Sequence, residues 1–261
     1  MAGESDSRTK FEGLADDYDL FRPRHPRELI QRVVEMIPMR QRLTVVDAGA
    51  GTGIALEGLK PLLGADCRYQ AVDLSADMVA RGRAKFPDVD WHVDAAEAFL
   101  ERAANIDLIL AAQSFQWMDR PRFLDAANRC LKPWGVLAIL QNNRNSSASR
   151  FLDAYESLLE ELSPGYRRDY RDFDLAGELE AAFVPDGGKV EVAVVDWIRT
   201  MPQDHFIGMV RSSTQAQRAL QARGGIFLER LAELVDVFSM DGLLSVPYRS
   251  ELVLGQKDRT P

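Results

Sequence analysis

Short aliphatic runs alternate with helical patterns between residues 43 and 140. The runs are rich in Val, Ile and Leu and are bounded by Gly, Asp or Pro, which is typical of buried strands. Strands that alternate with helices in this way form βαβ units in a parallel sheet. We therefore predict five strands, at residues 43–49, 67–73, 88–94, 106–113 and 135–140.

The segment between the fourth and fifth predicted strands has a clear helical period. Phe123, Ala127 and Cys130 fall on one helical face. Pro133 then ends the helix, because proline lacks the backbone donor that the next turn needs. We expect this helix to cross over one face of the sheet.

The chain ahead of the first strand also has a helical pattern. Phe11, Leu14, Ala15 and Tyr18 follow the i, i+3, i+4, i+7 spacing of one helical face. Prolines break the pattern before a second predicted helix at residues 29–36. We expect this lead-in either to cover a site or to pack on the sheet.

Beyond the fifth strand the pattern predicts a helical cap and two further strands. Helices are predicted at residues 151–162, 174–183 and 226–240, and strands at 190–197 and 243–254. Pro247 lies in the last strand, where a residue that cannot donate to the ladder favours an edge or bulge position. Together these elements predict an α/β fold with a Rossmann-like, seven-stranded, mostly parallel sheet. Helices cover both of its faces, the last strand is antiparallel, and a helical cap is attached.

The composition of the chain limits the kinds of partner that it is expected to bind. The chain has 40 acidic and 32 basic residues, a formal charge of -8, which argues against binding a nucleic acid backbone. No apolar run approaches the roughly 20 residues that cross a bilayer. The two cysteines and the absence of an apolar signal core indicate a reducing cytoplasm. We expect a small-molecule substrate, no nucleic acid, no membrane, no metal, and a monomer or homodimer.

A glycine-rich turn follows the first predicted strand. That strand runs into Gly49, Gly51 and Gly53, and a helix begins directly afterwards. Glycines let the backbone bend sharply and approach a ligand closely. Asp73 ends the next strand, where a carboxylate can accept hydrogen bonds from ribose hydroxyls. The pattern predicts a cofactor that contains a nucleoside.

The glycine spacing separates two such cofactors. Here it is G-x-G-x-G with Asp47 two residues ahead, whereas the dinucleotide fingerprint is G-x-G-x-x-G and holds a pyrophosphate at the helix N-terminus. S-adenosylmethionine has no phosphate to hold. The spacing therefore favours S-adenosylmethionine over NAD, and a dehydrogenase remains a third hypothesis.

The stretch VVDAGAGTG and the elements around it resemble class I S-adenosylmethionine-dependent methyltransferases. Within that family the likeness is to the small-molecule branch, which includes ubiquinone-biosynthesis and trans-aconitate methyltransferases, and it covers roughly residues 11–140. The resemblance implies that Asp73 binds both ribose hydroxyls and that Asp94 lies near the adenine amine. The full set that it implies for the cofactor is Asp47, Gly49, Gly51, Gly53, Asp73, Leu74, Met78, Asp94, Ala95, Gln113, Tyr18 and Arg22.

The sequence signals for the residues that face the methyl acceptor are less specific than those for the cofactor. The resemblance places Phe115, Gln116 and Trp117 facing the acceptor, yet many relatives have His where Gln116 stands. Without that His the most obvious general base is missing, so no catalytic residue is assigned. Arg144 follows the fifth strand and could bind an acidic substrate through two parallel hydrogen bonds, or it could be a solvated surface residue.

We therefore hypothesise an enzyme, an S-adenosylmethionine-dependent methyltransferase that acts by in-line transfer on oxygen or carbon of a small metabolite. The alternative is a protein that binds S-adenosylmethionine without transferring its methyl, as a cyclase or a regulator. Four parts are expected: a helical lead-in or lid at residues 1–40, the cofactor-binding core at 41–145, a helical cap insertion at 146–186, and a C-terminal part at 187–261 that completes the sheet.

Overall fold

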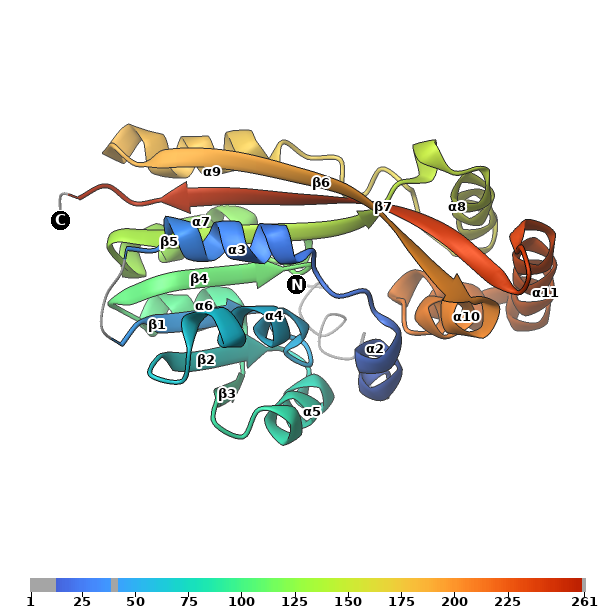
Figure 1. Ribbon diagram of the computed structural model, residues 1–261, viewed down its shortest axis with the longest axis horizontal. Helices are drawn as coiled ribbons and strands as arrows, with labels where there is room; N and C mark the ends of the chain where they lie inside the picture. The colour runs from blue at the N-terminus through green and yellow to red at the C-terminus, as the bar shows by residue number, and fades with distance from the viewer. Residues whose placement is uncertain (1–12, 39–41, 260–261) are drawn as a thin grey trace.

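The computed structural model describes residues 13–38 and 42–259, in which seven strands form one sheet of order β3-β2-β1-β4-β5-β7-β6 (Figure 1). All neighbouring pairs among β1 to β5 are parallel, and β7 is antiparallel to both β5 and β6. The predicted sheet and its antiparallel last strand are confirmed. The strands are β1 (Thr44–Ala48), β2 (Arg68–Asp73), β3 (Asp90–Val93), β4 (Ile106–Ala112), β5 (Leu131–Arg144), β6 (Lys189–Pro202) and β7 (Leu243–Gln256).

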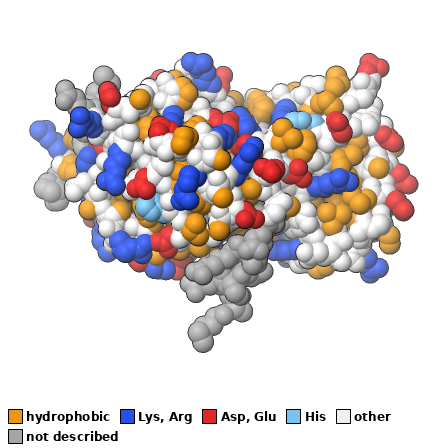
Figure 2. Space-filling model, turned by 90° about the horizontal axis from the view of Figure 1, so that it is seen from below, with side chains coloured by type: hydrophobic (Ala, Val, Ile, Leu, Met, Phe, Trp, Pro, Cys, Tyr) orange, Lys and Arg blue, Asp and Glu red, His pale blue; other side chains and the backbone are white. Residues whose placement is uncertain are grey.

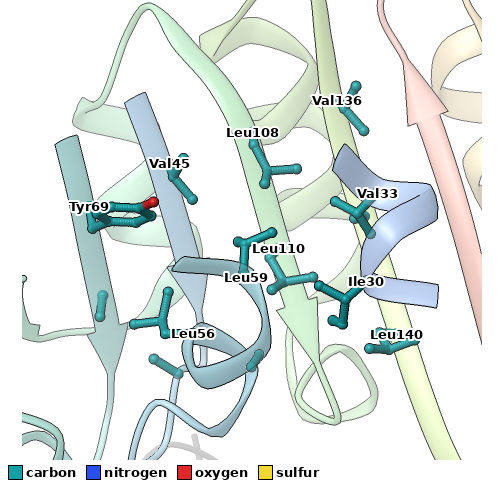
Figure 3. Packing of buried hydrophobic residues seen from close by; sticks show 14 of the residues in the cluster. Ile30, Val33, Val45, Leu56, Leu59, Tyr69, Leu108, Leu110, Val136 and Leu140 are labelled. Carbon is teal, nitrogen blue, oxygen red and sulfur yellow. The ribbon is translucent and has the colours of Figure 1, made fainter. Parts of the chain in front are cut away.

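One face of the sheet is covered by α3 (Arg27–Met36), α4 (Ile54–Leu63) and α5 (Ala76–Lys85). Their apolar stripes meet alternate residues of the strands, because successive strand side chains point to opposite faces. Figure 3 shows Ile30 and Val33 of α3 and Leu56 and Leu59 of α4 against residues of β1, β4 and β5. This packing fixes the start of α4, and so the glycine turn, above β1.

The opposite face is covered by α6 (Ala96–Arg102), α7 (Arg120–Cys130) and α9 (Leu175–Phe183). In α9, Leu175, Leu179 and Phe183 recur every four residues and are buried against the sheet. Although α9 lies within the segment expected to form the cap, it packs beside β6, β7 and α7. Its apolar stripe therefore completes the main core.

The cap is built from α8 (Arg150–Leu162), α10 (Gln203–Arg211) and α11 (Thr214–Phe238). Strands β6 and β7 are each 14 residues long and extend from the sheet to these helices (Figure 1). A separate cluster that includes Phe151, Tyr155, Phe206 and Phe227 holds the cap together. The sequence did not predict α10 or the first part of α11, which is interrupted at Arg223 by a non-helical backbone (φ -148°, ψ 38°).

Pro247 lies where β7 reaches the end of its ladder with β5 and continues beside β6. Along most of its length β7 is an interior strand between β5 and β6. Its last ladder pair with β5 joins Arg144 to Tyr248, and just beyond it the carbonyl of Pro247 accepts from the N–H of Asn145 at 2.9 Å, while Pro247 pairs with Ile198 of β6. Pro247 thus lies where the regular ladder with β5 ends, whereas the strand itself is not at the edge of the sheet.

Ahead of the sheet, α2 (Ala15–Phe21) contains part of the predicted lead-in helix, while Phe11 lies outside the described residues. Short 3-10 turns occur at Phe115–Trp117, Ser146–Ala148 and Val184–Asp186. Basic and acidic side chains are interspersed over the face drawn in Figure 2. Among residues 13–38 and 42–259, no helix is long and apolar enough to cross a membrane, and no group of His, Cys, Asp and Glu could hold a metal ion.

Candidate cofactor and substrate site

Two adjoining cavities open at the carboxyl ends of the strands, where open α/β sheets bind ligands. The smaller has a volume of about 110 Å³ and lies over β2 and β3, and the larger has about 350 Å³ and lies between β1, β5 and the cap. They share a wall that includes Tyr18, Gly49, Gln113 and Trp117. The arrangement suits a ligand that spans both cavities beside a second, smaller ligand.

The glycine turn forms part of that shared wall. Gly49 has φ +69°, and a Cβ there would lie 2.4 Å from Cβ of Ser114. Gly51 has φ +55° and lines the smaller cavity. Gly53 also has a left-handed backbone, but a side chain there would meet the ring of Phe86 at 3.0 Å. Gly53 therefore serves helix packing and does not line either cavity.

Asp73 lies at the end of β2 on the wall of the smaller cavity. Its Oδ2 accepts from the N–H of Gly51 at 2.8 Å, and its Oδ1 accepts from the N–H of Ser75 at 2.9 Å. Burial raises the pKa of Asp73, while these two donors act in the opposite direction. The two bonds fix the carboxylate, and each oxygen keeps a further lone pair for a ligand donor.

Asp47 at the end of β1 has an unusual environment. Its side chain lines the larger cavity, and the residue is only 1% exposed. Neither carboxylate oxygen has a hydrogen-bond partner within the described chain. Burial, together with the charge of Asp73, raises the pKa of Asp47 to about 7. A buried carboxylate without donors is costly, so the site favours a ligand that brings a cation or several N–H groups.

The far end of the smaller cavity has apolar and acidic walls. Leu74, Met78 and Asp94 line it, and Met78 is buried. Ala95 is not among the lining residues of this cavity. Its backbone N–H donates to Oδ1 of Asp94 at 2.8 Å. The other oxygen of Asp94 pairs with Arg102.

The turn after β4 separates the residues predicted to face the acceptor. Gln113 has a left-handed backbone (φ +58°) and lines both cavities. Trp117 also lines both, with its ring centroid 6.0 Å from that of Tyr170. Phe115 instead points into the core and is 1% exposed, and Gln116 donates to the carbonyl of Gln113 at 2.9 Å. Neither Phe115 nor Gln116 is among the cavity walls, because the 3-10 turn directs them away.

The lead-in helix α2 closes over the glycine turn. Tyr18 lines both cavities, and the guanidinium of Arg22 lies 4.8 Å from the centre of its ring. Arg22 also donates to the carbonyl of Ser212 in the cap at 3.0 Å. Burial lowers the pKa of Arg22, and the nearby charges of Arg144 and Arg171 lower it further. Both residues thus line the larger cavity, and the covering of the cofactor that the resemblance implies for them stays a prediction.

A buried acid that the sequence did not single out holds α2 in place. Oδ1 of Asp19 accepts from Oγ1 of Thr52, in the glycine turn, at 2.8 Å and from Nζ of Lys85, on α5, at 2.6 Å. Burial opposes the charged form, but Lys85 and Thr52 outweigh it and keep the pKa of Asp19 below its usual value. The helix is therefore tied to the glycine turn by a charged hydrogen-bond network.

The larger cavity contains residues that sequence reasoning missed or left open. Arg144, His25, Glu156 and Arg171 line it together. Burial lowers the pKa of His25 to about 4, so its ring is neutral at pH 7, and its Nδ1 has no partner among the described residues. Only the position of Arg144 after a strand signalled a site, since the others come from the lead-in and the cap.

Comparison with known proteins decides the family of the central part. Residues 45–135 match a family model described as a methyltransferase domain. Residues 45–135 form a methyltransferase domain. Their span runs from β1 to the fifth residue of β5 and contains the glycine turn and Asp73. The domain thus coincides with the strands that carry the smaller cavity.

Individual relatives match over a similar stretch. An uncharacterised methyltransferase of Schizosaccharomyces pombe is 30% identical over 151 residues, 57% of this chain and 58% of that protein. A trans-aconitate 2-methyltransferase of Azoarcus sp. is 37% identical over 119 residues, 45% of each chain. The chain thus spans about half the length of the curated relatives it matches. A candidate type II methyltransferase of Anaeromyxobacter dehalogenans has the same fold beyond the domain, with a TM-score of 0.66 at 23% identity over 92% of this chain and 99% of that one.

Proposed function

We propose that this protein is an S-adenosylmethionine-dependent methyltransferase that acts on an oxygen or carbon atom of a small metabolite. The observation that carries the proposal is the buried carboxylate of Asp47, which has no partner among the described residues and lines the cavity beside the glycine turn. An amino acid ammonium would supply the missing donors. The methyltransferase domain supports the same donor.

The residues around the two cavities fit each part of this cofactor. Asp47 would accept hydrogen bonds from the ammonium of the methionine part, and Arg22 would pair with its carboxylate. Asp73 would accept hydrogen bonds from the ribose hydroxyls, and Leu74 and Met78 would flank the adenine. Gly49 has no room for a side chain of its own, since a Cβ there would collide with Ser114.

S-adenosylmethionine, when bound, supplies a methyl carbon that its sulfonium makes electrophilic. The chain's own contribution is to hold the acceptor in line and to exclude water, which can supply much of the rate. Gln113 and Trp117 lie where the two cavities join, and α2 covers that junction. The neutral His25 can accept a hydrogen bond, but a pKa near 4 makes it a weak proton acceptor. An acceptor that arrives already deprotonated therefore suits this site best.

Calorimetric titration tests whether the protein binds the proposed methyl donor. We expect S-adenosylhomocysteine to bind wild-type protein and to bind at least tenfold more weakly to Asp73→Asn, because the ribose hydroxyls lose a charged acceptor. Asp66→Asn, at an exposed acid outside both cavities, is the matched control and should bind normally. NAD binding in place of S-adenosylhomocysteine would overturn the proposal.

Methyl transfer itself needs a labelled donor and a library of small acceptors, with mass spectrometry of the products. A product heavier by one methylene supports the enzyme. Turnover of a compound without consumption of the donor would favour the alternative of a protein that binds S-adenosylmethionine without transferring its methyl. The cytoplasmic location and the monomeric or homodimeric state inferred from the sequence stay predictions.

A further inference from the structure

Two arginines from different elements converge on the wall of the larger cavity. Arg144 ends β5, and Arg171 lies between α8 and α9. In each, Nε is buried and has no partner in the described parts of the chain. Arg171 donates through Nη1 to the side-chain oxygen of Asn143, and its guanidinium lies 4.9 Å from the centre of the Tyr170 ring. Both guanidinium groups are thus fixed while retaining an unused donor.

Two buried carboxylates of the described residues, Glu156 and Asp47, line the larger cavity, and Glu156 is the one that pairs with Arg144. Its Oε1 accepts from Nη2 of Arg144 at 3.2 Å, and its Oε2 accepts from the hydroxyl of Tyr166. Glu156 therefore balances the charge of Arg144 and leaves that of Arg171. Burial disfavours the charged form of Arg144, but Glu156 outweighs it and holds the pKa of Arg144 above its usual value.

The other charged walls of the cavity do not cancel this excess. Arg22 and Asp47 would be neutralised by the carboxylate and the ammonium of the donor under the proposed function. Asp172 is exposed to solvent, which screens its charge. Arg168 is engaged by Asp153 and Glu160, at 2.7 and 2.8 Å. One surplus positive charge therefore remains inside the acceptor part of the cavity.

Resting on the proposed function, we propose that the methyl acceptor is an organic acid whose carboxylate binds between Arg144 and Arg171. A single surplus charge matches a carboxylate better than the dianion of a phosphate monoester. The carbon skeleton of the acid would lie against the aromatic side chains of Trp117, Tyr170 and Tyr166, whose ring centroids follow one another at 6.0 and 5.8 Å. Aliphatic and unsaturated acids fit this combination of charge and apolar wall.

The test measures binding and does not depend on turnover. Protein saturated with S-adenosylhomocysteine is titrated with aliphatic mono-, di- and tricarboxylic acids from acetate to tricarballylate, with their neutral amides, and with glycerol phosphate. We expect at least one acid to bind and its amide not to. Arg171→Gln should weaken that binding roughly 10- to 100-fold, the usual worth of a hydrogen bond to a charged group. Arg167→Gln, on the same segment but outside the cavity, should leave it unchanged.

Arg144→Gln alone would leave Glu156 buried without its cation, so the double variant Arg144→Gln/Glu156→Gln removes both charges together. It should also weaken binding of the acid. The proposal is overturned if no acid binds better than its amide, if glycerol phosphate binds in preference, or if Arg171→Gln has no effect. Normal S-adenosylhomocysteine binding in these samples separates such a failure from a failure of the proposed function.

Discussion

The unpaired carboxylate of Asp47 predicts how stability depends on pH. Its pKa is raised from 3.8 to about 7. At about 1.4 kcal/mol per pKa unit, the shift corresponds to on the order of 4 kcal/mol. Between pH 4 and 7 the unfolded chain releases this proton while the folded chain keeps it. The contribution of Asp47 to stability is therefore lost as pH rises through that window.

Asp47→Asn isolates this contribution, because every other titrating group is shared by the two proteins. We expect the ligand-free variant to unfold at higher urea concentration than wild type at pH 8, by up to about 4 kcal/mol, with the difference vanishing near pH 4. This figure already includes relief of the repulsion with Asp73, which is one of the two causes of the raised pKa of Asp47. Tryptophan fluorescence in urea at pH 4.5, 6 and 8 measures the difference in free energy of unfolding between the variant and wild type. A difference that does not change with pH would refute the reasoning.

The same carboxylate makes cofactor affinity depend on pH. A bound ammonium stabilises only the charged form of Asp47, so wild-type protein must release the proton to bind at low pH. We expect the affinity for S-adenosylhomocysteine to fall roughly tenfold per pH unit below 7. Asp47→Asn should bind more weakly at pH 8 and lose this slope. A wild-type affinity that is flat between pH 5.5 and 7 would show that no cation reaches Asp47.

Three substitutions test other parts of the structure. Gly49→Ala should cost about 1–3 kcal/mol of stability and weaken cofactor binding, because its Cβ would overlap Ser114; adding Ser114→Gly should recover part of both losses, measured by urea unfolding and calorimetry. Lys132→Met should cost about 1–3 kcal/mol in urea, since it removes the cation 2.6 Å from the buried carboxylate of Asp107, which keeps its hydrogen bond from the N–H of Thr44 at 2.8 Å; an unchanged midpoint would contradict this. Phe115→Ala should lower the free energy of unfolding by about 3–5 kcal/mol and leave cofactor affinity unchanged. A loss of ligand binding without a loss of stability would show that Phe115 contacts the ligand.

The sheet and the glycine turn could be predicted because their signals are local. Aliphatic runs, the spacing of Gly49 and Gly51, and Asp73 at a strand end are all written in contiguous sequence. The first part of α11 was missed for the same reason, since Gly224 and Gly225 follow it closely and indicate a stop. There the cap packing against α8 overrides the local preference.

The acceptor side could be predicted only in part, because it depends on tertiary packing. The family resemblance implied that Phe115 faces the acceptor together with Trp117, but a single 3-10 turn sends the two side chains in different directions. Arg171, Glu156 and His25 come from three segments that no sequence period connects. Only the closure of α2 and α8 over the strand ends brings them to one cavity.

The long ladder between β6 and β7 separates the cap helices α10 and α11 from the strands that carry the glycine turn. Its pairing runs without a break from Lys189 with Gln256 to Pro202 with Leu243, and α10 and α11 are inserted at its far end. A segment grafted between Pro202 and Leu243 would be anchored by the same ladder whatever its sequence. The part of the larger cavity's wall that α10 and α11 supply can therefore be exchanged as one unit, while the strands that carry the glycine turn and Asp73 keep their register.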